Sequence, residues 1–188
     1  MFDEYWHEGL IHSAQHFLSS GRIPDNPDQM IRSATAADYD AVWEIFHAVI
    51  QTRDTYVFHP DTPQADLKQH WFAPYMHTCV CEEEGKILGT YILKPNQIDL
   101  GDHIANASYM VHPEAQGRGV GRQLGEHSLV LAKELGYLAM QFNIVVSTNQ
   151  PAVELWKKLG FEIIGTTPKG FRSSQGLVDT YIMYRSLV

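Results

Sequence analysis

Long apolar segments are missing from this 188-residue sequence, and cysteine is rare in it. No stretch approaches the roughly 20 consecutive apolar residues of a membrane-spanning helix. The acidic start of the chain, with Asp3 and Glu4, lacks the basic region and apolar core of a secretory signal. The two cysteines, Cys79 and Cys81, are expected to point to opposite faces of one strand, which suits neither a disulfide nor a C-x-x-C metal site. These absences predict a cytoplasmic protein without a membrane partner.

Positive charge is also scarce. The chain has 14 Lys and Arg against 22 Asp and Glu, for a formal net charge of −8 at pH 7. This balance argues against a nucleic-acid partner and suits cationic or neutral substrates. The hydrophobic fraction of 44% and the length of the chain are ordinary for one globular domain with a substantial core.

A glycine-rich segment follows the most strand-like part of the sequence. Residues 110–125 read M-V-H-P-E-A-Q-G-R-G-V-G-R-Q-L-G, and they join an apolar run over 104–111 to leucines at helical spacing. A helix N-terminus offers unpaired N–H groups and partial positive charge, and glycines let the backbone close on a bulky anion. The glycine spacing, G-x-G-x-G, fits neither a dinucleotide fingerprint nor a P-loop. The segment therefore predicts a phosphate cradle of another kind, or a structural turn before a helix.

Two motifs resemble those of the GNAT N-acetyltransferases. Gln116, Gly119 and Gly121 fill the fixed positions of the family's pyrophosphate-binding motif, [QR]-x-x-G-x-[GA]. Further along, the family pattern N-x-x-A-x-x-L-[YW]-x-K-x-G-F is matched by Asn149, Ala152, Leu155, Trp156, Lys158, Gly160 and Phe161. The resemblance indicates a GNAT domain over residues 31–188, preceded by an extension over 1–30.

Local patterns predict the elements around these motifs. Apolar spacing predicts an amphipathic helix over 3–19, within the N-terminal extension. Thr35 and Asp38 are placed for a capping box at the start of the next helix. The last two strands are expected over 161–166 and 177–184, joined by a long loop.

The resemblance implies a fold and a cofactor. The fold is α/β, with a central twisted mixed sheet of about seven strands flanked by helices. The strands over 104–112 and 138–146, the second buried on both faces, are implied to splay apart and leave a gap for the pantetheine arm. The implied cofactor is acetyl-CoA, with no metal; His12 and His16 are better explained as exposed histidines than as ligands. The implied contacts of the cofactor are Met110, Val111, Gln116, Gly117, Arg118, Gly119, Val120, Gly121, Arg122, Asn149, Ala152 and Trp156.

The usual acid and base of the family are both missing from their positions. Many members have a tyrosine, the presumed general acid, where this chain has Trp156, and a glutamate base where it has Asn106. Neither replacement serves as an acid or a base at neutral pH, so the resemblance implies that the amine loses its proton through ordered water. The residues that could border that relay are Ser108, Tyr109, His112 and His103, and a structural role is the alternative for each of them. The backbone N–H of Val111 is implied as a donor to the thioester oxygen.

Asn106 and Asn143 resemble the paired asparagines of a GNAT subgroup that includes fungal acetyltransferases of proline analogues. There the two amides hold the substrate and an ordered water at the reaction centre. A structural role is the alternative, since Asn143 interrupts an apolar run and could fix a bulge. Tyr56 and His59, in a loop that often covers the acceptor in this family, are candidate substrate contacts, with an ordinary polar loop as the alternative.

The sequence therefore predicts an enzyme, an acetyl-CoA-dependent N-acetyltransferase. It is expected to move the acetyl group to the primary or secondary amine of a small molecule by direct attack in a ternary complex. Amino acids, their analogues and amine toxins or antibiotics are the expected acceptors. Two alternatives stay open: a protein or peptide N-acetyltransferase, and a non-catalytic acyl-CoA-binding module. A homodimer is compatible with the family. Specificity is expected to lie in the loops over 51–62, 94–103 and 167–176, the last of which offers Arg172 to a substrate carboxylate.

Overall fold

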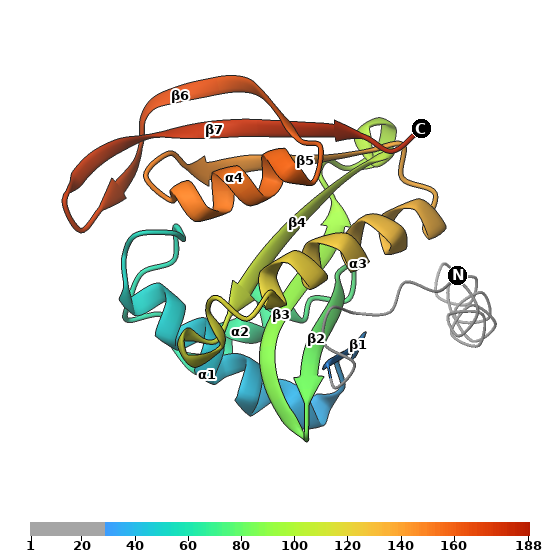
Figure 1. Cartoon of the computed structure of the whole chain (residues 1–188), viewed down its shortest axis with the longest axis vertical. Coiled ribbons are helices and arrows are strands. Elements are labelled where there is room, and N and C mark those ends of the chain that lie inside the picture. The colour runs from blue at the N-terminus through green and yellow to red at the C-terminus, as the bar shows by residue number, and fades with distance from the viewer. Residues whose placement is uncertain (1–28) are drawn as a thin grey trace.

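The computed structural model describes residues 29–188, which form one seven-stranded mixed sheet flanked by helices (Figure 1). The order across the sheet is β1-β2-β3-β4-β5-β7-β6. The strands are β1 (Gln29–Ser33), β2 (His77–Glu83), β3 (Lys86–Pro95), β4 (Ile104–Val111), β5 (Ala139–Val146), β6 (Glu162–Ser173) and β7 (Gly176–Ser186). The helices are α1 (Tyr39–Gln51), α2 (Leu67–Trp71), α3 (Val120–Glu134) and α4 (Gln150–Lys158). The predicted architecture is confirmed. The predicted helix over 3–19, with His12 and His16, lies outside the described residues.

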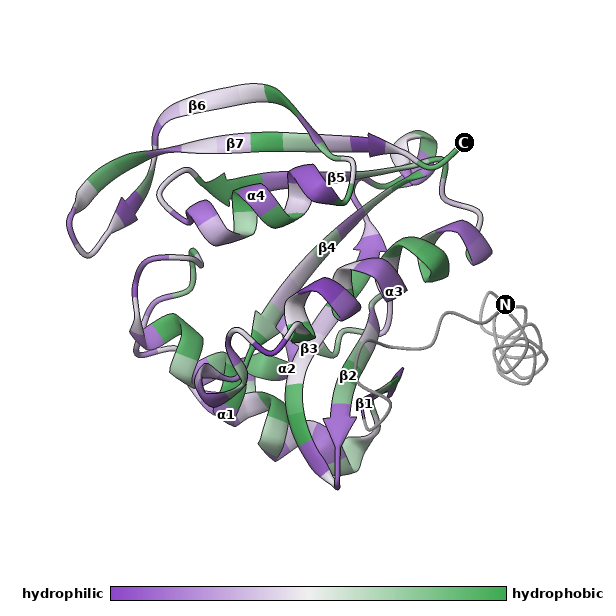
Figure 2. Cartoon of the chain, viewed as in Figure 1, coloured by the Kyte–Doolittle hydropathy of each residue, from purple (hydrophilic) through white to green (hydrophobic). Residues whose placement is uncertain are grey.

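Helices cover both faces of the sheet (Figure 1). Phe46 of α1 and Trp71 of α2 belong to a buried cluster on one face, and Leu124 of α3 and Trp156 of α4 belong to a second cluster. Along α3 and α4 in Figure 2, hydrophobic positions alternate with hydrophilic ones, as expected for helices with one buried side. No helix within residues 29–188 is long and apolar enough to cross a membrane.

The two parallel strands at the centre of the sheet separate along their length. β4 and β5 pair in register only at Ile104–Ala139 and Ala105–Met140, at the start of both strands. Every other neighbouring pair in the sheet is antiparallel and pairs at more positions than β4 and β5 do. The predicted splay is therefore present, and it opens toward the C-terminal ends of β4 and β5.

A bulge in β5 lies beside this opening. The register of β5 against β7 shifts between Phe142 and Val145, both of which stay buried in the core. Asn143 and Ile144 are exposed. The expectation that this strand is buried on both faces was wrong at these two residues, because a bulge adds residues to one strand and turns their side chains out of the regular alternation.

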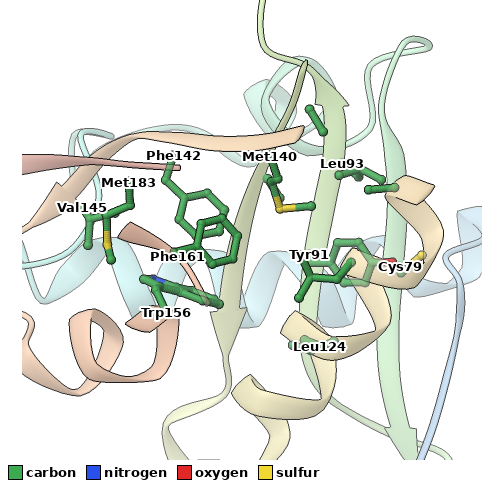
Figure 3. Packing of buried hydrophobic residues seen from close by; sticks show 14 of the residues in the cluster. Cys79, Tyr91, Leu93, Leu124, Met140, Phe142, Val145, Trp156, Phe161 and Met183 are labelled. Carbon is green, nitrogen blue, oxygen red and sulfur yellow. The ribbon is translucent and has the colours of Figure 1, made fainter. Parts of the chain in front are cut away.

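Aromatic side chains fill the space behind the separated strands (Figure 3). The rings of Phe142 and Phe161 stack with their centroids 4.3 Å apart. The ring of Trp156 lies 4.9 Å from that of Phe142 and 4.7 Å from that of Tyr109. These contacts pack α4 against β4, β5 and the residue just before β6. The gap between β4 and β5 is therefore backed by a well-packed wall.

An ion network holds the start of α1 against the edge of the sheet. Two nitrogens of the Arg32 guanidinium each donate to the carboxylate of Asp38 at 2.8 Å, and its Nε donates to Glu82 of β2 at 2.8 Å. Asp38 also accepts from the backbone N–H of Thr35 at 2.7 Å, which confirms the predicted capping box. The hydrogen bonds from Arg32 hold the pKa of Asp38 well below its usual range.

The C-terminal hairpin is longer than the sequence predicts. β6 and β7 pair from Glu162 and Tyr184 as far as Ser173 and Gly176, so most of the predicted loop over 167–176 is strand. Shifts in register after Ile163 and after Thr167 let the ladder continue past a proline and a glycine. Such residues predict a loop from sequence alone, but bulges accommodate them within a strand.

Cys79 and Cys81 lie on the same side of β2, and the expectation of opposite faces was wrong. Both belong to the buried cluster that also contains Leu124 of α3. Side chains two positions apart on a strand share a face. Both cysteines are free thiols, and burial raises the pKa of Cys81 to about 11. Their chemistry is that of small buried apolar residues.

The fold is expected to lose stability in mild acid because of His127 on α3. Its Nδ1 lies 2.7 Å from the hydroxyl of Tyr91, and burial lowers the pKa of this imidazole from 6.5 to about 4. The imidazole of His127 binds a proton more tightly in the unfolded chain than in the folded one. The contribution of the neutral imidazole to stability is therefore complete above pH 6.5 and is lost as the pH falls toward 4. Urea unfolding should give a free energy lower by roughly 2 kcal/mol at pH 4.5 than at pH 7.

The substitution His127→Gln should flatten this dependence, because glutamine keeps a hydrogen-bonding side chain but cannot titrate. His47→Gln, on the exposed side of α1, serves as the control for the effect of the substitution itself. A slope that stays unchanged in His127→Gln would assign the acid sensitivity to other groups.

Candidate active site

A cavity of about 280 Å³ opens where β4 and β5 separate. Its walls come from the loop after α1, from β4, from the bulged part of β5 and from the start of α4. The lining residues are Thr55, Tyr56, Val57, Phe58, Asn106, Ala107, Ser108, Tyr109, Phe142, Asn143, Ile144, Val145, Val146, Asn149, Ala152 and Trp156. The structure thus brings together Asn106, Asn143 and Tyr56, which the sequence analysis placed at the acceptor.

The backbone of β4 presents hydrogen-bonding groups to the gap. The carbonyl of Ile104 and the N–H of His112 both bond on the β3 side, to Asn96 and Leu88. Backbone direction alternates along a strand, so the odd-numbered residues of β4 face the opposite way. The N–H groups of Ala107, Tyr109 and Val111 therefore point into the gap, where β5 has moved out of pairing distance. A hydrogen-bonding ligand that lies in the gap as an extended strand would find these donors already aligned.

Tyr56 fastens the loop after α1 to this part of β4. Its hydroxyl donates to the carbonyl of Tyr109 at 2.6 Å, and burial raises the pKa of Tyr56 above its usual range. Two residues earlier in the loop, the carboxylate of Asp54 accepts from the hydroxyl of Ser174 at 2.6 Å and from the backbone N–H of Ser174 at 3.2 Å. The loop that forms one wall of the cavity is thus anchored at two points, on β4 and on the turn of the C-terminal hairpin.

A network of amides bridges the two separated strands. Asn96, just after β3, places its Oδ1 3.2 Å from Nδ2 of Asn106 and 2.7 Å from Nδ2 of Asn143. Asn106 also donates to the carbonyl of Gln141 at 3.0 Å, and the Gln141 side chain donates to Oδ1 of Asn143 at 2.9 Å. The two asparagines predicted at the reaction centre are therefore held by shared partners across the gap.

This network determines what Asn106 can offer a ligand. Both N–H groups of its amide are used, with the amide oriented as these two acceptors require. Its Oδ1 has no hydrogen-bond partner among residues 29–188. Asn106 can thus accept a hydrogen bond inside the cavity, from an amine N–H or from a water, but it has no further proton to give.

The predicted phosphate cradle lies at the mouth of the gap. Gly119 precedes the first residue of α3 in a left-handed conformation, with φ of +81°, and the first turn of α3 contains no acidic residue. A Cβ added at Gly121 would lie 3.7 Å from side chains of Val111 on β4 and Leu155 on α4. The positive end of α3 therefore adjoins the C-terminal end of β4.

The two arginines of the cradle are paired with glutamates. Arg118 forms an ion pair with Glu83 of β2, and Arg122 with Glu126 one turn along α3, at 3.0 Å. Both arginines lie at the N-terminal end of α3. A phosphate bound there would meet cations that are already paired with glutamates. That Arg118 and Arg122 contact the cofactor stays a prediction.

Asn149 and Trp156 are positioned by α4. The side-chain oxygen of Asn149 accepts from the backbone N–H of Ala152 at 3.4 Å and caps the helix. Trp156 is 7% exposed and belongs to the aromatic wall behind the gap. Both line the cavity, so they are available to a ligand that lies between β4 and β5.

Several predicted residues lie away from the cavity. His59 is exposed, with its Nδ1 3.5 Å from the carboxylate of Asp61. His103 is exposed at the start of β4, and Nδ1 of His112 accepts from the N–H of Glu114 at 3.2 Å. Arg172 is exposed on β6. None of these four predicted side chains lines the cavity, and a role for them in catalysis or binding stays a prediction.

Three polar residues of the site were missed by the sequence analysis. Asn96 and Gln141 complete the amide network, and Thr55 lines the cavity. Asn96 is followed by a polar loop and Gln141 lies in an apolar strand, so neither belongs to a recognisable motif. Only the pairing of β3 with β4, and of β4 with β5, brings them to Asn106.

A mixed sheet that opens between two parallel strands, with backbone donors along the opening and a glycine-preceded helix at its mouth, fits the class of acyltransferases predicted from the sequence. The family comparison agrees with this class: the model of the acetyltransferase (GNAT) family matches residues 42–161. The chain belongs to this family, and its relatives include proteins named as N-acetyltransferases.

Proteins similar to this chain include two relatives by sequence and one by structure. N-acetyltransferase aca1 of Schizosaccharomyces pombe is 32% identical over 112 residues, which cover 58% of this chain and 54% of aca1. The chain thus spans about half the length of that relative. L-amino acid N-acyltransferase MnaT of Escherichia coli is 33% identical over 146 residues, covering 74% of this chain and 83% of MnaT. The solved structure of a GCN5-related N-acetyltransferase from Kribbella flavida superposes with a TM-score of 0.82 at 36% identity, covering 85% of this chain and 98% of that one.

Proposed function

We propose that this protein transfers an acetyl group from acetyl-CoA to the amine of a small molecule, an amino acid or an analogue of one. The observation that carries the proposal is the cavity of about 280 Å³ between β4 and β5, lined by the asparagine pair and adjoining the strand donors. Its size suits a small acceptor. The relationship to MnaT, named for L-amino acid substrates, supports the same class. The two unpaired, buried cysteines support a reducing, cytoplasmic setting.

The described residues fit acetyl-CoA. The N-terminus of α3 and the glycines before it would hold the pyrophosphate, and the N–H groups of β4 would hold the pantetheine arm. Acetyl-CoA, when bound, supplies an activated acetyl group on a thiol that leaves readily. The N–H of Val111 would stabilise the negative charge that develops on the thioester oxygen.

The acceptor would be oriented by the amide network. The free Oδ1 of Asn106 can accept a hydrogen bond from the amine and thereby direct the nitrogen lone pair away from that bond. Asn143, on the opposite strand, would hold a water next to the same nitrogen. Ser108, which also lines the cavity, gives that water a second polar neighbour. The proton would then leave through water, since no carboxylate or imidazole lines the cavity within residues 29–188.

The test is the release of free thiol from acetyl-CoA in the presence of a panel of amines. The panel contains common amino acids, proline analogues, polyamines, aminoglycosides and short peptides. Turnover with small amino acids or their analogues is the expected result, and turnover with peptides alone would move the function to protein acetylation. Silence across the panel, while acetyl-CoA still raises the Tm, would leave a binding module without the proposed activity.

A further inference from the structure

The cavity wall carries no charged side chain within residues 29–188. Its polar groups are hydroxyls, amides and backbone atoms, and its remaining surface is apolar or aromatic. The ionisable side chains that line it are Tyr56 and Tyr109. Burial raises the pKa of both tyrosines above the usual range, so both stay neutral at physiological pH. A wall of this kind contains no proton acceptor strong enough to deprotonate an ammonium group.

Three charged groups on the surrounding elements make contacts away from the cavity. Asp54, next to the wall, bonds to Ser174 on the C-terminal hairpin. Lys94, which pairs with Asn106 in the register of β3 and β4, holds its ammonium over the ring of Tyr75, 5.9 Å from the centroid. On β7, Asp179 accepts from the backbone N–H of Lys169 at 2.8 Å. None of these charges lines the cavity.

An acceptor for such a site has to bring a nitrogen that is already neutral. An alkyl ammonium, with a pKa near 10.4, is neutral at pH 7 in fewer than about one molecule in a thousand. An α-amino group next to a carbonyl, with a pKa of about 8, is neutral in roughly one molecule in ten. The absence of a base in the wall therefore favours the weakly basic amine by about two orders of magnitude at pH 7.

The group next to the amine in the acceptor is also expected to be uncharged. A free carboxylate would enter a cavity whose lining residues, within 29–188, include no cation to pair with it, and an unpaired charge against a largely apolar wall is costly. The negative charge would also raise the pKa of the adjacent amine. An uncharged amide or ester avoids both penalties.

Thr55 is placed to recognise such an uncharged group. It lines the cavity, and its hydroxyl is buried without a hydrogen-bond partner among residues 29–188. Its neighbours Asp54 and Tyr56 are both anchored, so the backbone at Thr55 is held in place. Because Thr55 lines the cavity, a change of its χ1 rotamer is expected to bring the hydroxyl to the cavity surface. A ligand carbonyl there would give a buried donor the partner that it lacks.

We propose that the acceptor is a small α-amine with a polar but uncharged neighbouring group, such as an α-amino amide, and that Thr55 binds this group. The proposal rests on the proposed acetyltransferase function and narrows its substrate class. In the reaction the amine nitrogen bonds to the acetyl carbon as the carbon–sulfur bond breaks. The nitrogen loses one proton to water, the leaving thiolate gains one, and the products are an N-acetyl amide and the free thiol.

The experiment compares L-alaninamide, L-alanine and n-propylamine, which are similar in size, from pH 6 to pH 10 at saturating acetyl-CoA. At pH 7 we expect kcat/KM for alaninamide to exceed the values for alanine and propylamine by about tenfold or more. The rise of kcat/KM with pH should follow the pKa of each acceptor. A value for alanine equal to or above that for alaninamide would overturn the proposal. So would one inflection shared by all three acceptors, because that would reveal a base on the protein.

Variants of Thr55 test the recognition of the neighbouring group. Thr55→Val keeps the shape but removes the hydroxyl, and it should lower the ratio of kcat/KM for alaninamide to that for propylamine by roughly three- to tenfold, mainly through KM. Thr55→Ser should restore the ratio, and Thr166→Val, exposed on β6, should not change it. The Tm of Thr55→Val should not fall, since the hydroxyl lacks a partner in the structure. A lower Tm with an unchanged ratio would give Thr55 a structural role instead.

These outcomes are separable from a failure of the proposed function. If none of the three acceptors, nor any other amine of the panel, releases thiol while acetyl-CoA binds, the acetyltransferase activity itself is refuted. If alanine and other free amino acids are turned over but alaninamide is not, the activity stands and the proposed acceptor class is wrong.

Discussion

Replacing Asn106 and Asn143 together by alanine is expected to lower kcat by about a hundredfold. The free Oδ1 of Asn106 is the acceptor that would orient the amine, and Asn143 would hold the water that receives its proton. The Kd for acetyl-CoA should change by less than about twofold, because its expected contacts are backbone groups of β4 and the cradle of α3. Steady-state kinetics and calorimetric titration of acetyl-CoA measure the two effects separately.

Asn96→Ala provides the matched control. Asn96 bonds to both asparagines but does not line the cavity. Its loss leaves the two functional amides in place with more freedom to rotate, so kcat should fall by a smaller factor than in the double variant. Wild-type turnover in the double variant would rule out a role for the asparagine pair in the reaction and leave it the structural role of bridging the strands.

Gly119→Ala is expected to raise the KM for acetyl-CoA by about tenfold. At φ of +81° the added methyl is strained, and it would project into open space at the N-terminus of α3, where the pyrophosphate is expected. The change should reduce stability by about 1 kcal/mol through the left-handed conformation alone. Initial rates over a range of acetyl-CoA concentrations, together with urea unfolding, distinguish lost binding from lost stability.

Gly136→Ala carries the same backbone penalty at the other end of the same helix. Gly136 has φ of +84° just after α3, and a Cβ there also meets no atom within 4 Å. Its loss of stability should match that of Gly119→Ala, while the KM for acetyl-CoA stays at the wild-type value. Equal KM values in the two variants would show that the glycine loop does not form the cofactor site.

Local signals in the sequence were sufficient for the elements that carry the motifs. The capping box of Thr35 and Asp38 was predictable because both partners lie within one turn. The separation of β4 and β5 followed from the family resemblance and not from periodicity. The cavity residues Tyr56, Asn106 and Asn143 were found because each could be aligned to a family position or loop.

The features that the sequence did not reveal depend on contacts between distant segments. The position of Asn96 beside both Asn106 and Asn143 results from three strands coming together. The bulge that turns Asn143 outward is visible only against β7, and the length of β6 is determined by its ladder with β7. Local propensity carries no information about such register, so patterns of proline and glycine predicted a loop where the partner strand maintains pairing.

The bonds between Asp54 and Ser174 join residues that are 120 positions apart in the chain. During synthesis, the loop that forms one wall of the cavity leaves the ribosome long before the turn between β6 and β7 exists. Its outer anchor therefore forms only after nearly the whole chain has been made. The same bonds lie on the exposed surface, where local opening requires the least free energy. The loop after α1 that forms this wall of the cavity is thus expected to be the last part of the domain to become ordered on folding. It is also expected to be the first to exchange its amide hydrogens.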